Sequence, residues 1–244
     1  MGIRQSCVEC TVRGAHCFCN LNMDALRQLD TMGTQQGFAE GEIVLEEGAV
    51  PERVCVLCKG MVKLTTCSRE GKLLLLRIAG PGDVLGLASV LKDTAYEATV
   101  EALEECEVRV IPREHFLAFM DGFRGVGSNS AEAVAREYGS AVLSARRLAL
   151  SSSATGKLAN VLLDWGRLSA GRGLVGAAAG SPKKTEEALR FRMPLTHEEL
   201  GQMAGISRET TTRALTKLKA EGLVEMDGER MVLRSPEKLE RAYC

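Results

Sequence analysis

The chain of 244 residues is poor in aromatic side chains, in histidine and in net charge, and it has no long apolar run. Aromatic residues make up only 4% of it, so its cores must be built from Leu, Val, Ala and Ile. A net charge of −1 and an isoelectric point near 6.4 exclude a generally cationic coat, so any binding to nucleic acid must be confined to one face. Since no stretch approaches the length of a membrane span and the polar N-terminus is unlike a signal peptide, we expect a cytoplasmic protein with no membrane partner.

Two short helices joined by a turn are the strongest pattern that the chain does contain. Thr196 and Glu199 have the spacing of a capping box, which begins a helix. Gly205 interrupts the pattern, and Ser207 is placed to cap a second helix. Apolar residues recur at helical spacing in both segments, with Leu200, Met203 and Ala204 in the first and Ala214, Leu215 and Leu218 in the second. This arrangement is typical of the helix-turn-helix unit that reads DNA.

The second helix is basic, although the chain as a whole is not. Between Ile206 and Ala220 the charged residues are Arg208, Arg213, Lys217 and Lys219 against the single acid Glu209. A helical hairpin with a solvated charged face would have the same charges. However, the segment from Gly205 to Arg213 reads G-x-S-R-E-T-x-x-R without a gap, and it closely resembles the DNA-reading helix of the Crp/Fnr family of bacterial transcription regulators.

The resemblance implies roles for seven side chains of this helix. Those suited to the edges of bases are Arg208 and Arg213, for guanine O6 and N7, and Glu209, for cytosine N4. Those suited to phosphates are Ser207, Thr210 and Lys217. Thr212 stands where relatives vary between Gly and Ser, so we expect it to tune the half-site. Arg208 favours a half-site of the TGTGA kind over the TTGAT kind.

Residues 37–112 have the pattern of a compact β domain, in which turns containing Gly separate short strands. The expected strands are Glu42 to Leu45, Val54 to Leu57, Met61 to Thr66, Leu73 to Ile78 and Glu107 to Ile111. The family resemblance extends through Gly82 to Gly86 and through Cys106 to Val108. It implies an α+β protein whose sensor domain is a jelly roll of the cyclic-nucleotide-binding type.

The residues expected to hold a cyclic phosphate in such a domain are absent. Nucleotide-binding relatives carry Gly-Glu after the Gly-Asp turn and Arg-Ser/Thr-Ala further on, where this chain has Gly86-Leu87 and Tyr96-Glu97-Ala98. An acidic Glu97 with no Arg nearby would make anion binding costly, so we do not expect cyclic AMP as a ligand. A metal-dependent β-roll enzyme is not expected either, because the three histidines (His16, His115 and His197) lie outside the expected strands.

A long helix is expected to follow the β domain. Apolar residues recur there at alternating steps of four and three, which is a heptad seam for pairing with a second copy: Val134, Tyr138, Ala141, Ala145 and Leu148. A helix packed on its own β domain is the alternative. Ser151 to Ser153 has the composition of a hinge, a further helix bearing Leu158 and Trp165 follows it, and Ser169 to Thr185 reads as a loop. We therefore expect an arm (1–22), a β-roll (23–125), a dimerisation helix (126–150) and a winged helix-turn-helix domain (151–244).

Nine cysteines offer the only strong clue to what the protein senses. Four of them crowd the N-terminal arm: Cys7, Cys10, Cys17 and Cys19. Thiolates this close on a flexible arm suit a [4Fe-4S] cluster or a tetrahedral zinc. The spacing resembles the C-x2-C-x5-C arm of Fnr-type oxygen sensors, although the third cysteine stands one residue late. A cluster, zinc or simple thiol oxidation, and no metal at all remain open.

The fourth ligand of those sensors comes from the β-roll, three residues before a Pro. Counting back from Pro112, that position holds Arg109 here, whereas Cys106 matches a core cysteine of members without a cluster. A cluster would therefore need either Cys19 or a displaced β-roll thiol, and one of the neighbours Cys17 and Cys19 is a candidate spectator. Cys55 and Cys58 lie on opposite faces of one expected strand, and both, like Cys67, are expected to be small core residues.

Together these patterns predict a DNA-binding regulator, not an enzyme, that acts as a homodimer on palindromic double-stranded DNA. Its signal is expected at the arm or the β-roll, and the resemblance implies RNA polymerase as a further partner. Rival hypotheses are a regulator of the same fold with a zinc, thiol or small-ligand sensor, and a ligand-binding module without DNA function. The sequence does not name the signal, the target genes or the sign of regulation.

Overall fold

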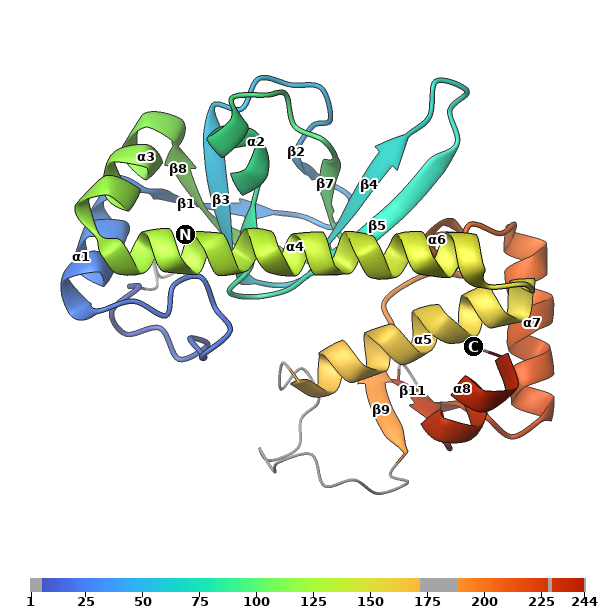
Figure 1. Ribbon diagram of the computed structural model, residues 1–244. Helices are drawn as coiled ribbons and strands as arrows, with labels where there is room; N and C mark the ends of the chain where they lie inside the picture. Colours follow the sequence, from blue (N-terminus) through green and yellow to red (C-terminus); the bar gives the residue numbers. More distant parts are fainter. Residues whose placement is uncertain (1–5, 172–187, 228–229, 244) are drawn as a thin grey trace. The chain divides into compact units, whose positions relative to one another are not determined.

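The computed structural model describes residues 6–171, 188–227 and 230–243. The chain divides into two compact units, Met1–Ala141 and Val142–Cys244. One long helix, α4 (Arg124–Leu150), crosses the boundary between them (Figure 1). Among the helices of the described part, none is long and apolar enough to cross a membrane.

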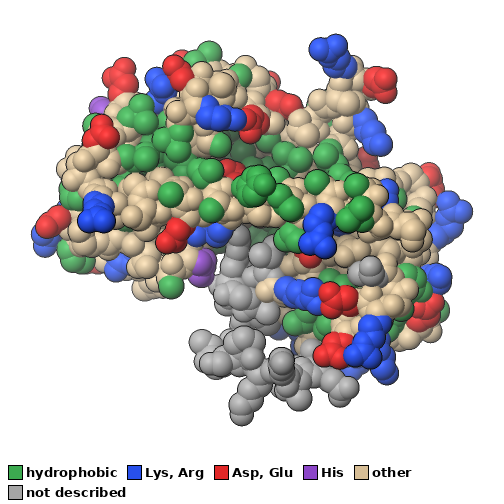
Figure 2. All heavy atoms as spheres, in the orientation of Figure 1, with side chains coloured by type: hydrophobic (Ala, Val, Ile, Leu, Met, Phe, Trp, Pro, Cys, Tyr) green, Lys and Arg blue, Asp and Glu red, His purple; other side chains and the backbone are tan. Residues whose placement is uncertain are grey.

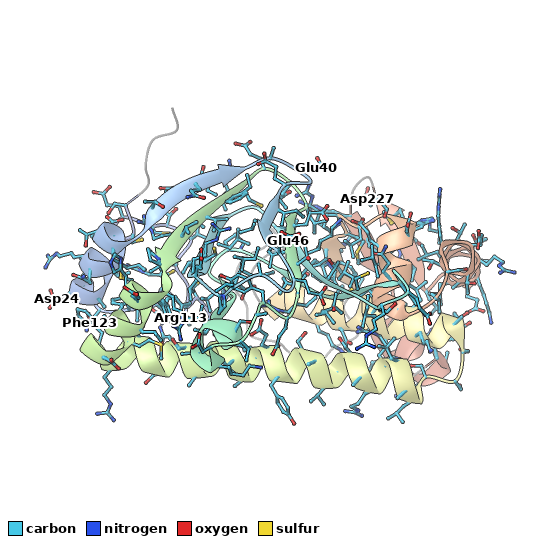
Figure 3. The ribbon with its side chains drawn as sticks, turned by 90° about the horizontal axis from the view of Figure 1, so that it is seen from above. Asp24, Glu40, Glu46, Arg113, Phe123 and Asp227 are labelled. Carbon is cyan, nitrogen blue, oxygen red and sulfur yellow. The ribbon has the colours of Figure 1, made fainter. Side chains whose placement is uncertain are left out.

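Two four-stranded antiparallel sheets form the body of the first unit. The first has the order β1-β8-β3-β6, with β1 (Thr34–Phe38), β8 (Cys106–Pro112), β3 (Arg53–Lys59) and β6 (Val84–Leu85). The second has the order β2-β7-β4-β5, with β2 (Ile43–Leu45), β7 (Thr99–Ala102), β4 (Val62–Cys67) and β5 (Leu73–Ala79). Side chains from both sheets, among them Leu57, Leu64 and Val108, form an inner core. Figure 3 shows the side chains crowded among the strands of this unit.

The jelly-roll domain expected from the sequence is therefore present. All five expected strands are found, as β2, β3, β4, β5 and β8. The sequence analysis did not resolve β1, β6 or β7, and β6 is only two residues long. The helix α2 (Leu87–Lys92), which follows the Gly-Asp turn, was not predicted either.

The outer surface of the first sheet carries a second core, on which the helices of this unit pack. Strand β3 alternates, so that Cys55 and Leu57 point into the inner core while Val54 and Val56 point outward. Helices α1 (Met23–Met32) and α3 (Arg113–Gly122) cover this outer surface, where Phe18 of the arm and Phe116 of α3 pack with their ring centroids 5.8 Å apart. The outer surface is thus the place where the N-terminal arm meets the β-roll.

The second unit is a helical domain closed by a small sheet. Helix α5 (Ala154–Gly171) buries Leu158, Val161, Leu162 and Trp165, as the spacing predicts. The indole Nε1 of Trp165 donates to the carbonyl oxygen of Arg192 over 3.0 Å, which ties α5 to the sheet. The remaining elements are β9 (Leu189–Arg192), α6 (His197–Ala204), α7 (Arg208–Ala220), β10 (Val224–Asp227), β11 (Arg230–Leu233) and α8 (Pro236–Tyr243), with the sheet order β10-β11-β9.

Two expected connections can be compared with the structure. The segment Ser151 to Ser153 does separate α4 from α5, and the hydroxyl of Ser153 accepts a hydrogen bond from the backbone N–H of Gly156 over 3.0 Å. A loop was expected at residues 169–185, but the first three of these residues belong to α5, which continues through Gly171. The rest of that expected loop lies outside the described residues.

Candidate functional site

The two helices of the expected helix-turn-helix unit are joined as their capping residues predict. The hydroxyl oxygen of Thr196 accepts from the backbone N–H of Glu199 over 3.2 Å, and the carboxylate of Glu199 accepts from the N–H of Thr196 over 2.8 Å. Gly205 ends α6 with φ +65°, a conformation that favours glycine. A Cβ on Gly201 would lie 2.7 Å from the carbonyl oxygen of Ile206, so this glycine permits the close packing of α6 against the turn. The sequence analysis did not single out Gly201.

Helix α7 buries one side and exposes the other. Ser207 is its N-cap, and its hydroxyl accepts from the N–H of Thr210 over 3.2 Å. The buried side consists of Thr211, Ala214, Leu215 and Leu218. Of the seven predicted contact residues, Thr210 is half-buried and the other six are exposed: Ser207, Arg208, Glu209, Thr212, Arg213 and Lys217. The structure therefore brings the predicted residues together on one helix and leaves most of them accessible.

Two of these side chains have partners that the sequence did not predict. The hydroxyl oxygen of Thr212 lies 2.9 Å from Nδ1 of His197, the first residue of α6. The ammonium of Lys217 lies 5.2 Å from the centroid of the Tyr243 ring, whose hydroxyl donates to Glu221 over 2.6 Å. Contacts across the turn and from α8 thus position two residues of the exposed side of α7.

Tyr96 and Glu97, which stand where nucleotide-binding relatives carry Arg-Ser/Thr, have partners within the β-roll. A Cβ on Gly86 would lie 2.8 Å from the Tyr96 ring, and the Tyr96 hydroxyl donates to the carbonyl oxygen of Arg53 over 2.7 Å. Glu97 pairs with Lys92. These contacts agree with the expectation that cyclic AMP is not the ligand, which stays a prediction.

The N-terminal arm packs against the outer surface of the β-roll, contrary to the expectation of a flexible arm. Cys17 and Phe18 are buried, and the N–H of Phe18 donates to the carbonyl oxygen of Gly82 over 2.8 Å. The side-chain amide of Asn129 on α4 donates to the carbonyl oxygens of Phe18 and Asn20 over 2.7 and 3.0 Å. The arm is therefore held from two sides within the first unit.

An ion pair between a buried arginine and a half-buried aspartate holds the beginning of the arm. Arg109 of β8, which is only 1% exposed, places its guanidinium 3.0 Å from the Asp30 carboxylate. The same carboxylate accepts from the hydroxyl of Ser6 over 2.6 Å and from the N–H of Cys7 over 3.0 Å. Although burial opposes it, these hydrogen bonds and Arg109 lower the pKa of Asp30. Arg109, at the position of the family's fourth ligand, thus acts here through Asp30 on Cys7.

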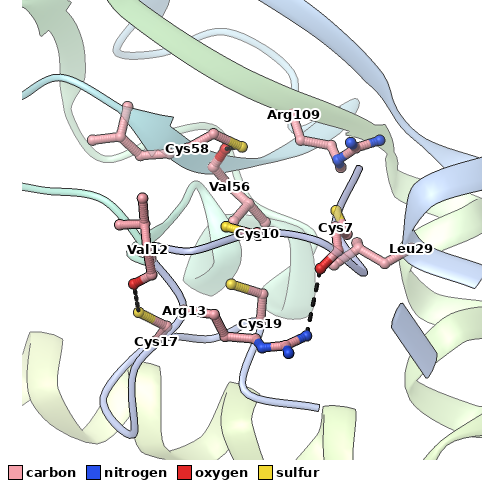
Figure 4. Close-up of a pocket in the computed structure, with 12 residues that line it drawn as sticks. Cys7, Cys10, Val12, Arg13, Cys17, Cys19, Leu29, Val56, Cys58 and Arg109 are labelled. Carbon is pink, nitrogen blue, oxygen red and sulfur yellow. Dashed lines mark hydrogen bonds between the residues drawn. The ribbon is translucent and has the colours of Figure 1, made fainter. Parts of the chain in front are cut away.

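Five cysteines line one pocket between the arm and the β-roll (Figure 4). Four are the predicted arm residues Cys7, Cys10, Cys17 and Cys19, and the fifth is Cys58 of β3. Arg109, Leu29 and Val56 also line the pocket. The sequence analysis placed Cys58 correctly on the face opposite Cys55, but it did not foresee that this face would meet the arm.

The expectation that Cys55, Cys58 and Cys67 are all core residues holds for one of them. Cys55 is fully buried in the inner core. Cys58 is half-buried beside the pocket, and Cys67 is exposed. The prediction fails for Cys67 because it ends β4, where that strand leaves the core. Cys106, by contrast, is fully buried in the inner core, as expected for a residue without a metal role.

The surroundings of the pocket thiols shift their pKa values in both directions. Burial raises the pKa of Cys7 to about 12 and also raises that of Cys58. A hydrogen bond between Cys17 and Cys19 lowers the pKa of Cys17 to about 6 and, together with burial, raises that of Cys19. Within the described part of the chain, no three His, Cys, Asp or Glu side chains converge closely enough to hold a single metal ion. The sulfurs surround the pocket without meeting at one point.

The exposed side of α4 differs by about one residue from the predicted seam. Tyr138, Ala141 and Ala145 are exposed, whereas Val134 packs partly on the outer core and Leu148 is half-buried beside Gly205. A heptad series that is exposed throughout consists of Ala131, Ala135, Tyr138, Val142, Ala145 and Ala149. Apolar side chains are visible along α4 in Figure 2. The helix therefore offers a continuous apolar stripe that shares Tyr138 and Ala145 with the prediction.

A β-roll connected through a long helix to a helix-turn-helix unit defines a two-domain regulator of transcription. Residues 35–123 match the family model of the cyclic nucleotide-binding domain, and residues 156–242 match that of the Crp-like helix-turn-helix domain. The chain belongs to the Crp/Fnr family of DNA-binding transcription regulators. Membership in this family also confirms that the protein is not an enzyme.

Individual relatives agree with this assignment. The cyclic AMP receptor protein of Thermus thermophilus is 26% identical over 78% of this chain and 78% of its own length. The transcriptional activator protein FnrL of Cereibacter sphaeroides is 24% identical over 95% of this chain and 88% of its own. Among solved structures, FixK2 from Bradyrhizobium japonicum has the same fold, with a TM-score of 0.71 at 23% identity over 87% of this chain and 98% of that one.

Proposed function

We propose that this regulator is a homodimer that reads palindromic double-stranded DNA and senses oxygen or redox state through an iron–sulfur cluster bound to its N-terminal cysteines. The observation that carries the proposal is the position of the arm, whose four cysteines all line one pocket on the β-roll. A sensor at this place can influence the first turns of α4, because Asn129 of that helix binds the arm.

The donor set is chemically suited to a cluster. Iron–sulfur clusters take thiolate ligands, and the pocket offers five thiols. A tetrahedral zinc holds its sulfurs about 2.3 Å from one atom, hence roughly 4 Å from each other, and the described residues form no such group. When bound, a cluster supplies iron–thiolate bonds that are sensitive to oxidants, and Cys7, Cys10, Cys17 and Cys19 are the arm residues available to hold it.

Dimerisation is supported by the apolar stripe of α4. Tyr138 is 72% exposed and Val142 38% exposed, on a helix whose other residues of the same stripe are alanines. Small residues let two helices approach closely, and a two-fold axis would present two α7 helices to major grooves one helical turn apart.

The proposed contacts with DNA follow from the exposed side of α7. Arg208, Glu209 and Arg213 would meet base edges, with Thr212 tuning the half-site. Ser207, Thr210 and Lys217 would meet phosphates. We expect a half-site of the TGTGA kind. We also expect RNA polymerase to be the partner that contacts the DNA-bound dimer. Cyclic AMP, which the Thermus relative's name indicates for that protein, is not proposed here, because the acidic Glu97 stands at the sequence position where nucleotide-binding relatives carry a phosphate-binding side chain.

Anaerobic purification tests the sensor part of the proposal. The wild-type protein should show visible absorbance from bound iron and sulfide, and the Cys7→Ser and Cys10→Ser variants should lose it. If the purified protein contains zinc and no iron, the site is a zinc site and not an iron–sulfur cluster. If the wild-type protein is colourless and contains neither metal, the hypothesis that remains is a thiol or small-ligand sensor.

Selection from random duplexes tests the DNA part. The protein should enrich inverted repeats, and a fluorescently labelled repeat should bind more tightly than a scrambled duplex of equal length. Enrichment of single, unpaired half-sites by a monomer would contradict the dimer. Failure to enrich any sequence, in the presence and absence of oxygen, would favour a module without DNA function.

A further inference from the structure

The identity of the fourth cluster ligand can be inferred from the β-roll, provided that the cluster of the proposed function is bound. The family's usual β-roll position holds Arg109, whose guanidinium is fixed by Asp30 and cannot serve as a ligand. Cys106 faces the inner core, on the other side of the sheet. The described β-roll therefore needs another thiol that points toward the arm.

Cys58 satisfies this requirement because of where it lies on β3. Val54 and Val56 point to the outer surface, and Cys58 lines the pocket on that same side of the sheet. The register between β3 and β8 shifts between Leu57 and Lys59, which is a bulge at Cys58. A bulge re-aims a side chain without ending the strand, and Cys58 here lines the pocket next to Arg109.

The arm cysteines are not equivalent in their relation to Cys58. Cys58 interacts electrostatically with Cys7, Cys10 and Cys19, whereas Cys17 interacts with Cys19. Figure 4 shows all five cysteines around the pocket, with Cys17 beside Val12.

Cys17 interacts with Cys19 and with the backbone of the arm's own turn. Its sulfur accepts from the N–H of Gly14 over 3.3 Å and lies 3.7 Å from the carbonyl oxygen of Val12. It also packs so closely on Gly82 that a Cβ there would be 2.2 Å from it. These contacts give Cys17 a structural role in holding the arm.

We propose that Cys7, Cys10, Cys19 and Cys58 are the four ligands of the cluster, and that Cys17 is not a ligand. The ligand from the β-roll thus comes from β3 and not from β8. Arg109, a buried cation beside the pocket, offsets the negative charge that four thiolates bring to it.

Iron and acid-labile sulfide per protomer, measured on full-length protein reconstituted anaerobically with ferrous iron and sulfide, test this assignment. Cys58→Ala and Cys19→Ala should lose the bound iron and its visible absorbance. Cys17→Ala should keep them. Cys67→Ala is the matched control, because Cys67 is a β-roll cysteine that is exposed and does not line the pocket.

The possible outcomes separate this inference from the function on which it rests. If Cys58→Ala retains iron, the ligand assignment is wrong. It is also wrong if Cys17→Ala loses iron while Cys19→Ala retains it. In both cases the protein still binds a cluster. A wild type that binds no iron overturns the cluster itself.

A measurement on the wild type covers the case in which a variant does not fold. Alkylation followed by mass spectrometry should modify Cys58 only after a chelator has removed the iron, whereas Cys67 should react before and after. Equal reaction of Cys58 in both states overturns the assignment.

Discussion

At the scale of single residues, Gly82 decides whether the arm can pack on the β-roll. Its φ is +89°, and the side of the residue that lacks a Cβ faces the sulfur of Cys17. The carbonyl oxygen of the same glycine accepts from the N–H of Phe18 over 2.8 Å. One residue thus provides both the room and a hydrogen bond for the arm.

We predict that Gly82→Ala releases the arm, whereas Gly71→Ala does not. Gly71 is the matched control because its φ is +80° and a Cβ there would meet nothing within 4 Å. Both variants should lose about 1–2 kcal/mol of stability through the left-handed backbone. Gly82→Ala should lose roughly 1–3 kcal/mol more through overlap with Cys17. Urea unfolding and the alkylation rate of Cys17 measure the difference, and equal results for the two variants would contradict the role of Gly82.

A second residue-scale prediction concerns how α7 reads DNA. Arg213→Ala should weaken binding to the specific site by about 1–3 kcal/mol and relax the preference at one base pair. Lys217→Ala should weaken binding to matched and scrambled duplexes equally, because a phosphate contact carries no sequence information. Fluorescence anisotropy on both duplexes checks this. Equal losses for Arg213→Ala on the two duplexes would refute the assignment of Arg213 to a base.

At the scale of elements, α4 has two different surfaces. One packs on its own chain, with Val134 on the outer core and Arg147 pairing with Asp164 over 3.2 Å. The other is the apolar stripe through Tyr138 and Val142, which has no partner within the described chain. A heptad pattern predicts a helix with an apolar face. It does not distinguish the packed surface from the exposed one, because the two differ by only one residue position around the helix.

We predict that Val142→Asp dissociates the dimer and that Leu143→Asp does not. The two positions have similar exposure, 38% and 43%, but they lie about 100° apart around the helix. A carboxylate at the seam would be buried in the dimer opposite its own copy, which should cost about 3 kcal/mol, or roughly a hundredfold in the dissociation constant. Sedimentation velocity gives the result. If only Leu143→Asp dissociates the dimer, the seam must lie on the side of α4 that carries Leu143.

At the scale of the whole molecule, charge is distributed unevenly. The chain carries a net charge of −1, yet α7 exposes Arg208, Arg213 and Lys217 together. Association with DNA therefore depends on this one surface of each protomer and not on the average charge of the protein.

We predict that the binding constant for DNA falls linearly with salt concentration on a double logarithmic scale. Each phosphate neutralised by Lys or Arg contributes about 0.9 to the slope. In a dimer, Lys217→Ala should reduce the slope by about 2, one for each protomer. Titrations at several salt concentrations measure it, and a binding constant independent of salt would favour a module that contacts protein and not DNA.

Much of this fold could be predicted because its signals are local. Thr196, Gly205 and Ser207 identify the helix-turn-helix through contacts that span three or four residues. Five strands, including the three-residue β2, could be located between their glycines. Strand β1 could not, because its sequence Thr-Gln-Gln-Gly-Phe is mostly polar and exposed. The short strands β6 and β7 could not, because two to four residues carry too little pattern.

The candidate sensor could be predicted only in part, because its contacts join segments that are distant in the sequence. The arm cysteines stand out by their spacing, but Cys58 joins them through a sheet register and a bulge that the sequence does not show. Gly82 and Cys17 meet across 65 positions of chain, a contact that no periodicity indicates.

By itself, the sequence determined the family, the reading helix and its basic residues, since caps, turns and helical spacing act between near neighbours. Only the tertiary structure decided which surface of α4 is free, that Arg109 holds Cys7 through Asp30, and that Cys58 faces the arm. These features depend on how distant segments pack, and packing selects one of several arrangements that the same local pattern allows.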